Sequence, residues 1–181
     1  MVTSENDLKM LLKALAFAAH KHRDQRRKDV ESSPYINHPI SLASILCNEG
    51  HVTDTEVICA ALLHDTVEDT DTTAEELEQE FSAAIRHIVM DVTDDKTLGK
   101  AERKQRQVDH AADICDQAKL VKLADKISNL RDVAGNPPAG WDVKRRREYF
   151  DWAKAVIDRL RGVHGPLEDL FDTEYRNRPG A

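Results

Sequence analysis

The sequence predicts an all-α domain of roughly eight to ten helices. Apolar residues recur three and four positions apart along most of the 181-residue chain, which is the period of an amphipathic helix. No segment alternates apolar and polar residues for long enough to predict a sustained strand. Glycine (7) and proline (6) are scarce, so few positions interrupt helices. We expect residues 1–181 to form a single domain, with a frayed tail at 175–181.

Composition excludes several classes of protein. A net charge of −7 argues against a protein that coats nucleic acid, although locally clustered basic residues are compatible with a small phosphorylated substrate. No apolar run approaches the ~20 residues that cross a bilayer, and residues 1–10 contain no apolar signal core. The three cysteines are far apart and form no CxxC pair, which is typical of reduced thiols. We therefore expect a cytoplasmic protein that contacts no membrane.

The first helix is expected to carry apolar residues from Leu8 to Ala19, with Ser4 and Asp7 as its capping box. It runs into the densest basic stretch of the chain, HKHRDQRRK at 20–28. Two interpretations of this stretch stay open. It is either a solvated helix end, where cations complement the helix dipole, or a phosphate grip that ends in Arg27 and Lys28.

A second helix is expected to follow the sequence PYINHP at 34–39. Pro39 suits the first turn of a helix and should hold His38 outside helical geometry, at a rigid junction. The apolar pattern of this helix ends near residues 48–50. Thr53 and Glu56 are expected to cap the third helix. A junction histidine is by itself more often an ordinary polar residue, so His38 gains a functional meaning only from its neighbours.

The third helix carries the stretch around which the chain is organised, AALLHDTVEDT at 60–70. His64 and Asp65 are adjacent, so their side chains can converge only near the end of a helix. Glu68 and Asp69 each follow one of them by four residues. A divalent cation would offset the mutual repulsion of these acids and would use the imidazole as well. A polar helix end that contains His-Asp by chance is the alternative.

The middle of the chain is less distinctive. Thr73 and Glu76 are expected to cap a helix whose apolar pattern continues to Val92. The highly polar segment 93–116, which contains Lys100, is either helix or loop. Because this segment has the weakest pattern in the chain, we consider it a candidate for a mobile lid.

Residues 119–132 predict a helix with a stripe of leucine and isoleucine. Asp125 and Asn129 lie four residues apart on one face of it, at the border of that stripe. Since burying an unpaired carboxylate is costly, Asp125 needs a partner. That partner is either a neighbouring lysine, Lys122 or Lys126, or a metal ion.

The last third of the chain contains a loop at 135–140, a helix that continues to Leu160, and a short helix at 167–175. Trp141 and Tyr149 flank a run of four cations, KRRR at 144–147. Both aromatic residues are expected to be partly buried in the core. Beside these cations they are also suited to stacking on a nucleotide base.

His38, His64, Asp65 and Asp125 together form a set of two imidazoles and two carboxylates. Such a set suits one manganese(II), iron(II) or zinc(II) ion, and the lack of cysteine argues against a structural zinc site. Such an ion lowers the pKa of water and polarises a phosphoryl oxygen. Glu68 and Asp69, just outside this set, could orient that water or move protons.

The order of these residues resembles the HD-domain metal-dependent phosphohydrolases. Within them, the chain is similar to the hydrolase domain of the RelA/SpoT alarmone enzymes, and most of all to the stand-alone small alarmone hydrolases. The resemblance reaches across most of the chain. The stretches that carry it are HRDQRRKD (22–29), SPYINHPI (33–40), AALLHDTVEDTDTT (60–73), VTDDKTL (92–98), KLVKLADKISNLRD (119–132) and GWDVKRRREYFDWA (140–153).

The resemblance implies a helical bundle with a central metal site and the same four metal ligands. It also implies catalytic roles for Glu68 and Asp69. The substrate contacts that it implies are Arg27, Lys28, Lys100, Asn129, Trp141, Arg145 and Tyr149. The implied activity is manganese-dependent hydrolysis of (p)ppGpp at its 3′-pyrophosphate, which releases pyrophosphate and leaves GDP or GTP.

Two other functions stay open at this stage. Removal of the 2′-phosphate of NADPH would use the same site, since that phosphate also lies on a ribose that carries a base. A catalytically silent nucleotide-binding module is the second alternative. A small nucleotide is the expected partner in each case, and assembly into a homo-oligomer is left open.

Overall fold

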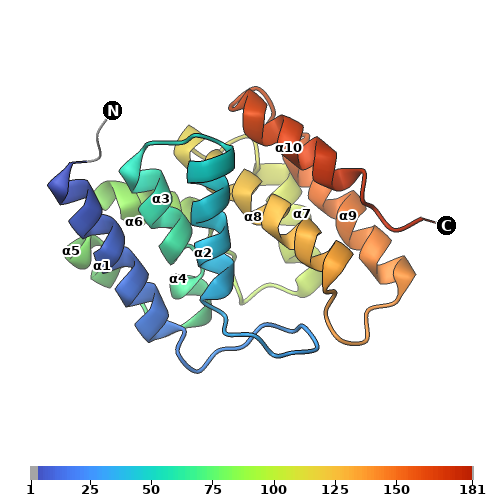
Figure 1. Ribbon diagram of the computed structural model, residues 1–181, viewed down its shortest axis with the longest axis horizontal. Helices are drawn as coiled ribbons and strands as arrows, with labels where there is room; N and C mark the ends of the chain where they lie inside the picture. The colour runs from blue at the N-terminus through green and yellow to red at the C-terminus, as the bar shows by residue number, and fades with distance from the viewer. Residues whose placement is uncertain (1–3, 181) are drawn as a thin grey trace.

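The computed structural model describes residues 4–180. Within this range the chain forms ten α-helices and one π-helical segment, η1 (Figure 1). Their bounds are α1 (Glu5–Lys21), α2 (Asn37–Ser44), η1 (Ile45–Glu49), α3 (Thr55–Leu63), α4 (Thr66–Asp69), α5 (Ala74–Glu80), α6 (Ala83–Val92), α7 (Lys100–His110), α8 (Asp116–Gly135), α9 (Val143–Ile157) and α10 (Gly165–Tyr175). The prediction of an all-α fold is confirmed.

Two central helices organise the bundle. Residues 57–63 of α3 are all buried, as expected for a helix that is apolar on every side, and α3 packs against α1, α2, α6 and α8. Helix α8 packs in turn against α2, α6, α9 and α10. Figure 1 shows α2 and α8 in the middle of the molecule, with α1 and α3 on one side and α9 and α10 on the other. The start of α2, the end of α3 and the middle of α8 therefore meet at the centre.

The prediction that His38 lies outside helical geometry is wrong. Helix α2 begins at Asn37, so His38 lies in its first turn and Pro39 follows it there. The first N–H groups of a helix have no acceptor within the helix, so the missing N–H of Pro39 costs nothing at this position. The bias against helical geometry before proline is a preference that other contacts outweigh here.

The helix caps are partly as predicted. Ser4 and Asp7 form the expected capping box of α1, and Thr73 caps α5 by accepting the N–H of Glu76. The cap of α3, however, is Asp54 rather than Thr53, because the carboxylate of Asp54 accepts the N–H groups of the first turn. A carboxylate at this position also complements the positive end of the helix dipole.

The segment expected to form one helix from Thr73 to Val92 forms two. Helix α5 ends at Glu80, and the extended backbone of Ser82 separates it from α6. The Ser82 hydroxyl accepts the N–H of Ile85 at 3.1 Å. Serine side chains compete for backbone hydrogen bonds in this way and favour the start of a helix over its interior.

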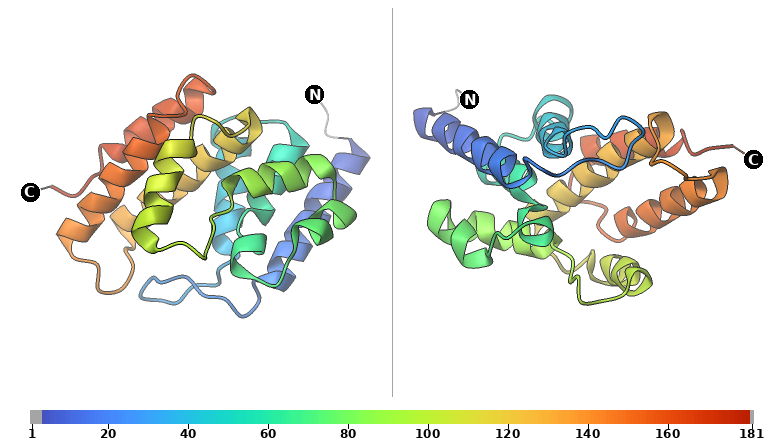
Figure 2. Two further views of the ribbon diagram at one scale, coloured as in Figure 1. Left: turned by 180° about the vertical axis from the view of Figure 1, so that it is seen from behind. Right: turned by 90° about the horizontal axis from the view of Figure 1, so that it is seen from below.

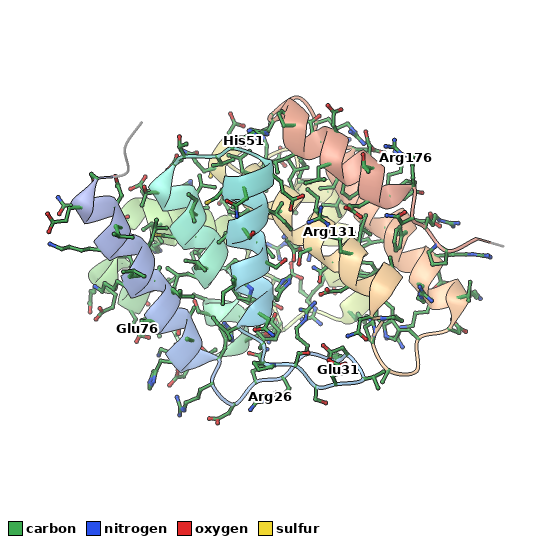
Figure 3. All side chains as sticks on the ribbon, viewed as in Figure 1. Arg26, Glu31, His51, Glu76, Arg131 and Arg176 are labelled. Carbon is green, nitrogen blue, oxygen red and sulfur yellow. The ribbon has the colours of Figure 1, made fainter. Side chains whose placement is uncertain are left out.

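Two segments flank α8 where the functional residues meet. The 22–36 loop follows α1, and Figure 3 shows its residues Arg26 and Glu31 at the lower edge of the molecule. The segment 100–110, whose structure was left open, is helix α7, which packs against α9. The view from below shows the 22–36 loop and α7 on opposite sides of α8 (Figure 2, right). Motion of α7 as a lid stays a prediction.

The described part of the C-terminal tail contacts the bundle. Arg178 donates two hydrogen bonds to Asp151, at 2.7 and 2.6 Å, and Arg147 donates to the carbonyl of Pro179 at 3.0 Å. The frayed tail stays a prediction, since it includes Ala181, which lies outside the described residues. Among the described helices, none combines the length and the apolar character that a membrane crossing needs.

Arg131 ties three elements together and provides a test of the fold. On α8 (Figure 3), its guanidinium donates to both carboxylate oxygens of Glu49, each at 2.8 Å, and to Glu174 of α10 at 2.9 Å. Hydrogen bonds from Arg131 lower the pKa of Glu49 below its ordinary value of 4.5. A lowered pKa stabilises the fold at pH values above the ordinary one, and the effect disappears as Glu49 becomes protonated.

We expect Arg131→Met to destabilise the fold by about 1 kcal/mol at pH 7, a small value because the site is partly exposed. The difference from the wild type should shrink below the ordinary glutamate pKa of 4.5 and vanish in stronger acid. Urea unfolding at several pH values measures it, with the exposed Lys144→Met as the control. A difference that does not change with pH would assign the effect to packing instead.

Candidate metal centre and adjoining cavity

The four predicted ligands come together at the centre of the bundle. His38 comes from the first turn of α2, His64 and Asp65 from the junction between α3 and α4, and Asp125 from the middle of α8. His38 Nε2 lies 3.3 Å from Asp125 Oδ1, and His64 Nε2 lies 2.9 Å from Asp65 Oδ2. Ligand atoms of His38, His64 and Asp65 all lie within 4.8 Å of one another. All four residues line one cavity of about 180 Å³.

The orientation of His64 fits a metal ion. Its Nδ1 lies 2.8 Å from the carbonyl oxygen of Ala61, so this nitrogen donates its proton there and Nε2 faces the cavity. The buried Nε2 lies 2.9 Å from Asp65 Oδ2. In a neutral ring its lone pair would face this carboxylate, and a cation bound between the two would remove that repulsion.

Each of the other ligands is also held by an outer partner. Tyr35 donates its hydroxyl to Asp65 Oδ2, and Asn129 donates to Asp125 Oδ1 at 2.6 Å. His38 Nδ1 lies 3.3 Å from the hydroxyl of Ser128. Outer partners of this kind orient ligands and fix histidine tautomers in metal sites. The four candidate ligands and the residues that orient them therefore fit a divalent ion.

The charges of the cavity agree with this fit. Burial disfavours the charged imidazole of His64, but the adjacent Asp65 raises its pKa to about 9. Burial would raise the pKa of Asp65, but His64 lowers it below the ordinary range. Burial lowers the pKa of His38. In the absence of a cation, a proton on His64 thus balances the carboxylate, and metal binding would release it.

Asp125 has the lysine partner that the sequence left open as an alternative. Its Oδ2 lies 2.9 Å from Lys126 Nζ, while its Oδ1 faces His38 and Asn129. Against the effect of burial, Lys126 and His38 hold the pKa of Asp125 well below its ordinary value. Lys126 Nζ also lies 4.4 Å from the centre of the Trp152 ring. Lys126 and a metal ion could therefore both contact Asp125, the lysine at Oδ2 and the ion at Oδ1.

A larger cavity of about 510 Å³ adjoins the ligands. It shares Arg27, Tyr35, Glu68 and Asn129 with the smaller one. Cations line much of it, namely Arg26, Arg27, Lys28, Lys96 and Arg103. Tyr35, Trp141 and Tyr149 add aromatic surface. Cations that bind phosphate and rings that stack on a base suit a nucleotide.

The structure brings most of the implied substrate contacts into this cavity. Those that line it are Arg27, Lys28, Asn129, Trp141 and Tyr149. Arg145 is exposed, and its guanidinium lies 4.5 Å from the centre of the Trp141 ring. Lys100 is exposed in the first turn of α7 and lines neither cavity.

The two acids that follow the ligands have different surroundings. Glu68 lines both cavities, and its Oε2 accepts the N–H of Asp94 at 3.1 Å. Burial, then the negative charge of Asp65, raises the pKa of Glu68. Asp69 lines only the larger cavity of the two, where it contacts Gln25 and Lys96.

Several residues of the site were not predicted from the sequence. Tyr35 donates a hydrogen bond to Asp65. The guanidinium carbon of Arg27 lies 5.6 Å from the centre of the Tyr35 ring. Lys96 and Arg103 add cations to the larger cavity. Tyr35 lies in the loop before α2, so no helical spacing in the sequence indicates its contact with Asp65. Lys96 lies in a turn, where no periodic pattern exists to indicate its direction.

A second group of potential ligands lies away from the cavities. His87 and Asp91 of α6 lie near Cys115, at the start of α8. Asp91 Oδ2 accepts the backbone N–H of Cys115 at 2.9 Å. This contact gives the group a structural explanation, since an acid at the start of a helix satisfies a free N–H and complements the helix dipole.

Comparisons with known proteins agree with this geometry. A family model described as an HD domain matches residues 14–151. The chain is 59% identical over 169 residues to the guanosine-3′,5′-bis(diphosphate) 3′-pyrophosphohydrolase MESH1 of Danio rerio, covering 93% of this chain and 94% of that protein. It is 54% identical to the protein of the same name from Homo sapiens, with the same coverage.

Relatives extend to bacteria. The bifunctional (p)ppGpp synthase/hydrolase SpoT of Escherichia coli is 34% identical, and the match covers 96% of this chain but 25% of that protein. A solved structure described as "A metazoan ortholog of SpoT hydrolyzes ppGpp and plays a role in starvation responses" superposes with a TM-score of 0.91 at 47% identity, over 98% of each chain. An HD domain implies a bound metal ion, which the donor set described above fits. The chain belongs to the HD-domain family and, within it, to the group of MESH1 proteins.

Proposed function

We propose that this protein is a manganese-dependent (p)ppGpp 3′-pyrophosphohydrolase, which forms GDP or GTP and pyrophosphate. The observation that carries the proposal is the shared wall between the two cavities. Arg27, Tyr35, Glu68 and Asn129 border both the metal ligands and the cavity lined by cations. A phosphate held in the larger cavity therefore lies next to the metal centre. The MESH1 relatives, which are guanosine-3′,5′-bis(diphosphate) 3′-pyrophosphohydrolases, support the same reaction.

The reaction is the attack of water on the phosphorus bonded to the ribose 3′-oxygen. A new bond forms between the water oxygen and phosphorus, and the bond between phosphorus and the 3′-oxygen breaks. The water loses a proton and the 3′-oxygen gains one. When bound, manganese(II) supplies a Lewis acid for this reaction, and zinc(II) or iron(II) would suit the same four residues, His38, His64, Asp65 and Asp125.

The chain's own residues supply the remaining roles. Glu68 and Asp69 orient the water, take its proton and return a proton to the leaving oxygen; the position of Glu68 at the border of both cavities supports this role. Arg27 and Lys28 neutralise the diphosphates, and Asn129 donates a hydrogen bond to the substrate. Lys100 and Arg145 stay proposed contacts at the rim.

Trp141 and Tyr149 form the proposed base platform, with their ring centres 5.7 Å apart. We expect Trp141→Ala to raise KM for ppGpp about tenfold, because stacking on a base is worth about 1–3 kcal/mol. The value of kcat should change less than about threefold, because the ring is remote from the reacting bond. Steady-state kinetics measure both, and Trp141→Phe, which keeps an aromatic face, is the control. A fall in kcat alone would contradict this role.

Two other functions use the same site. A 2′-phosphatase acting on NADPH would place its phosphate at the same metal centre, and a silent nucleotide-binding module would bind without turnover. Parallel measurement of kcat/KM for ppGpp and NADPH on one preparation separates them. Faster turnover of ppGpp supports the proposal, faster turnover of NADPH favours the phosphatase, and binding without turnover favours the silent module.

We also propose a cytoplasmic protein whose partner is a small nucleotide rather than nucleic acid. The net charge of −7 and three unpaired cysteines support this proposal. Reduced thiols are typical of cytosolic proteins. A chain of net negative charge repels the long phosphate backbone of nucleic acid, whereas the local cluster of cations in the larger cavity suits a small phosphorylated molecule.

A further inference from the structure

The helix cap explains only part of the group formed by His87, Asp91 and Cys115. One oxygen of Asp91, Oδ2, accepts the backbone N–H of Cys115 at 2.9 Å. This contact uses neither the imidazole of His87 nor the thiol of Cys115. Yet a nitrogen, a carboxylate oxygen and a sulfur, one atom from each residue, all lie within 4.8 Å of one another. The meeting of three different metal-binding side chains needs a second explanation.

Two helices bring this group together. His87 and Asp91 belong to α6, and Cys115 directly precedes α8. Because His87 and Asp91 are four residues apart, they lie on the same face of their helix, a spacing that suits two ligands of one ion. Helices α6 and α8 pack against each other, which places the thiol beside that face. The group is therefore a product of the fold and joins positions 24 residues apart.

The charges around Asp91 favour a cation. Among the described residues, Asp91 forms no ion pair with a lysine or an arginine, and its one basic neighbour is His87, whose Nε2 lies 3.9 Å from Oδ2. This distance is too long for a hydrogen bond. The side chain of Asp91 is only 23% exposed, whereas that of His87 is 64% exposed. A largely buried carboxylate needs a partner, and an ion from solvent can reach it beside His87.

The distances suit an ion of the size of zinc(II). Zinc binds nitrogen and oxygen at about 2.0–2.2 Å and thiolate sulfur at about 2.3 Å, with tetrahedral geometry. Its ligand atoms are therefore roughly 3.3–3.6 Å from one another, slightly closer than the 3.9 Å between His87 Nε2 and Asp91 Oδ2. Rotation of the exposed ring of His87 closes this difference.

The thiol of Cys115 determines which ion fits. Thiolate sulfur is a soft ligand that favours zinc(II) over manganese(II), and an imidazole and a carboxylate are compatible with zinc(II) as well. Burial raises the pKa of the Cys115 thiol, so the ion has to displace a proton when it binds. The four ligands proposed for the central site include no sulfur, and the two sites therefore differ in the ion that they prefer.

We propose that His87, Asp91 and Cys115 form a second metal site, selective for zinc(II), which fastens α6 to the start of α8. Three protein ligands leave one tetrahedral position for water. None of the three residues lines either cavity of the central site, so the ion stabilises the fold and takes no part in the chemical step. This inference does not depend on the proposed function.

Cobalt(II), used as a spectroscopic substitute for zinc(II), tests the inference directly. Cobalt(II) bound to a thiolate absorbs in the near ultraviolet through charge transfer from sulfur to metal, and the central site, which has no sulfur ligand, gives no such band. Metal-stripped, reduced protein should develop this band until one thiolate site per chain is filled. Zinc(II) should then abolish the band by displacing cobalt(II), and an equal concentration of manganese(II) should not.

Two variants and one control assign the band to this group. Cys115→Ser should abolish it and still fold, because Cys115 is the N-cap of α8 and serine is a preferred residue there. His87→Gln should raise the Kd for cobalt(II) at least about a hundredfold, since loss of even an outer partner of a ligand costs about ten- to a hundredfold. Cys47→Ser, at another partly buried free cysteine, is the matched control and should keep the band.

Thermal unfolding tests the effect on the fold. Zinc(II) at a hundred times its Kd should raise the melting temperature of the wild type about 5–10 °C more than that of Cys115→Ser. No band in the wild type, or a band that survives Cys115→Ser, would overturn the site. An equal shift by zinc(II) in both proteins would overturn its role in fastening α6 to α8. Because no measurement uses ppGpp, failure of the proposed function would leave these results unchanged.

Discussion

Asp65→Asn is expected to lower kcat/KM for ppGpp by at least about a thousandfold, because it removes a charged ligand from the metal centre. Asparagine has the same shape, so the change tests charge rather than packing. Asp65 lies 2.9 Å from His64 Nε2 and accepts from Tyr35, and the amide would weaken both contacts. Steady-state kinetics and metal analysis on the same sample test this prediction, and we expect both kcat/KM and the bound metal content to fall.

Asp113→Asn is the matched control, since that carboxylate is 77% exposed in the turn between α7 and α8. It should keep full activity and full metal content. Asp65→Asn is also expected to lower the melting temperature at neutral pH, because, against the effect of burial, the contacts of this carboxylate with His64 and Tyr35 hold its pKa low and stabilise the fold; both measurements are therefore made at a temperature where the variant is folded. Full turnover by Asp65→Asn would remove Asp65 from the ligand set.

Glu68→Gln is expected to lower kcat by about a hundredfold to ten-thousandfold, the range typical of general acid–base catalysis. Glutamine keeps the acceptor for the N–H of Asp94 and cannot carry a proton for the reaction. KM and metal content should stay within about threefold of the wild type, because Glu68 is outside the proposed ligand set. Single-turnover kinetics with saturating metal measure the chemical step.

Glu78→Gln, at an acid on the exposed face of α5, should leave kcat unchanged and serves as the control. Loss of metal from Glu68→Gln would make Glu68 a ligand instead. An unchanged kcat would show that another group transfers the proton, and Asp69 would be the first to examine.

That the proposed metal ligands come together could be predicted from the sequence because their local patterns are strong. His64 and Asp65 directly follow a run of apolar residues, 57–63, so the sequence indicated that they lie next to the core. Asp125 and Asn129 lie one turn apart on α8, and their hydrogen bond of 2.6 Å follows from that spacing. The helical spacing of apolar residues likewise predicts most of the helices.

Contacts made by loops could not be predicted in this way. The Lys96 ion pair, the Gln25 amide and the Tyr35 hydroxyl depend on how the 22–36 loop and the 93–99 turn pack against α4. No periodicity constrains the direction of a side chain in a turn. The break at Ser82 was missed for a related reason, because apolar residues keep helical spacing on both sides of it. Lys100, which the resemblance implies as a substrate contact, lies exposed on α7 and lines neither cavity, so its role stays a prediction.

The central claim is that a metal at these four ligands makes the protein a ppGpp hydrolase. Its most direct test is pyrophosphate release from ppGpp by metal-stripped protein, before and after adding manganese(II), with the Asp65→Asn variant in parallel. The account predicts no release without metal, full release after manganese(II) is added, and none from the variant under either condition. Release that is unaffected by stripping, or none with the metal restored, would contradict it.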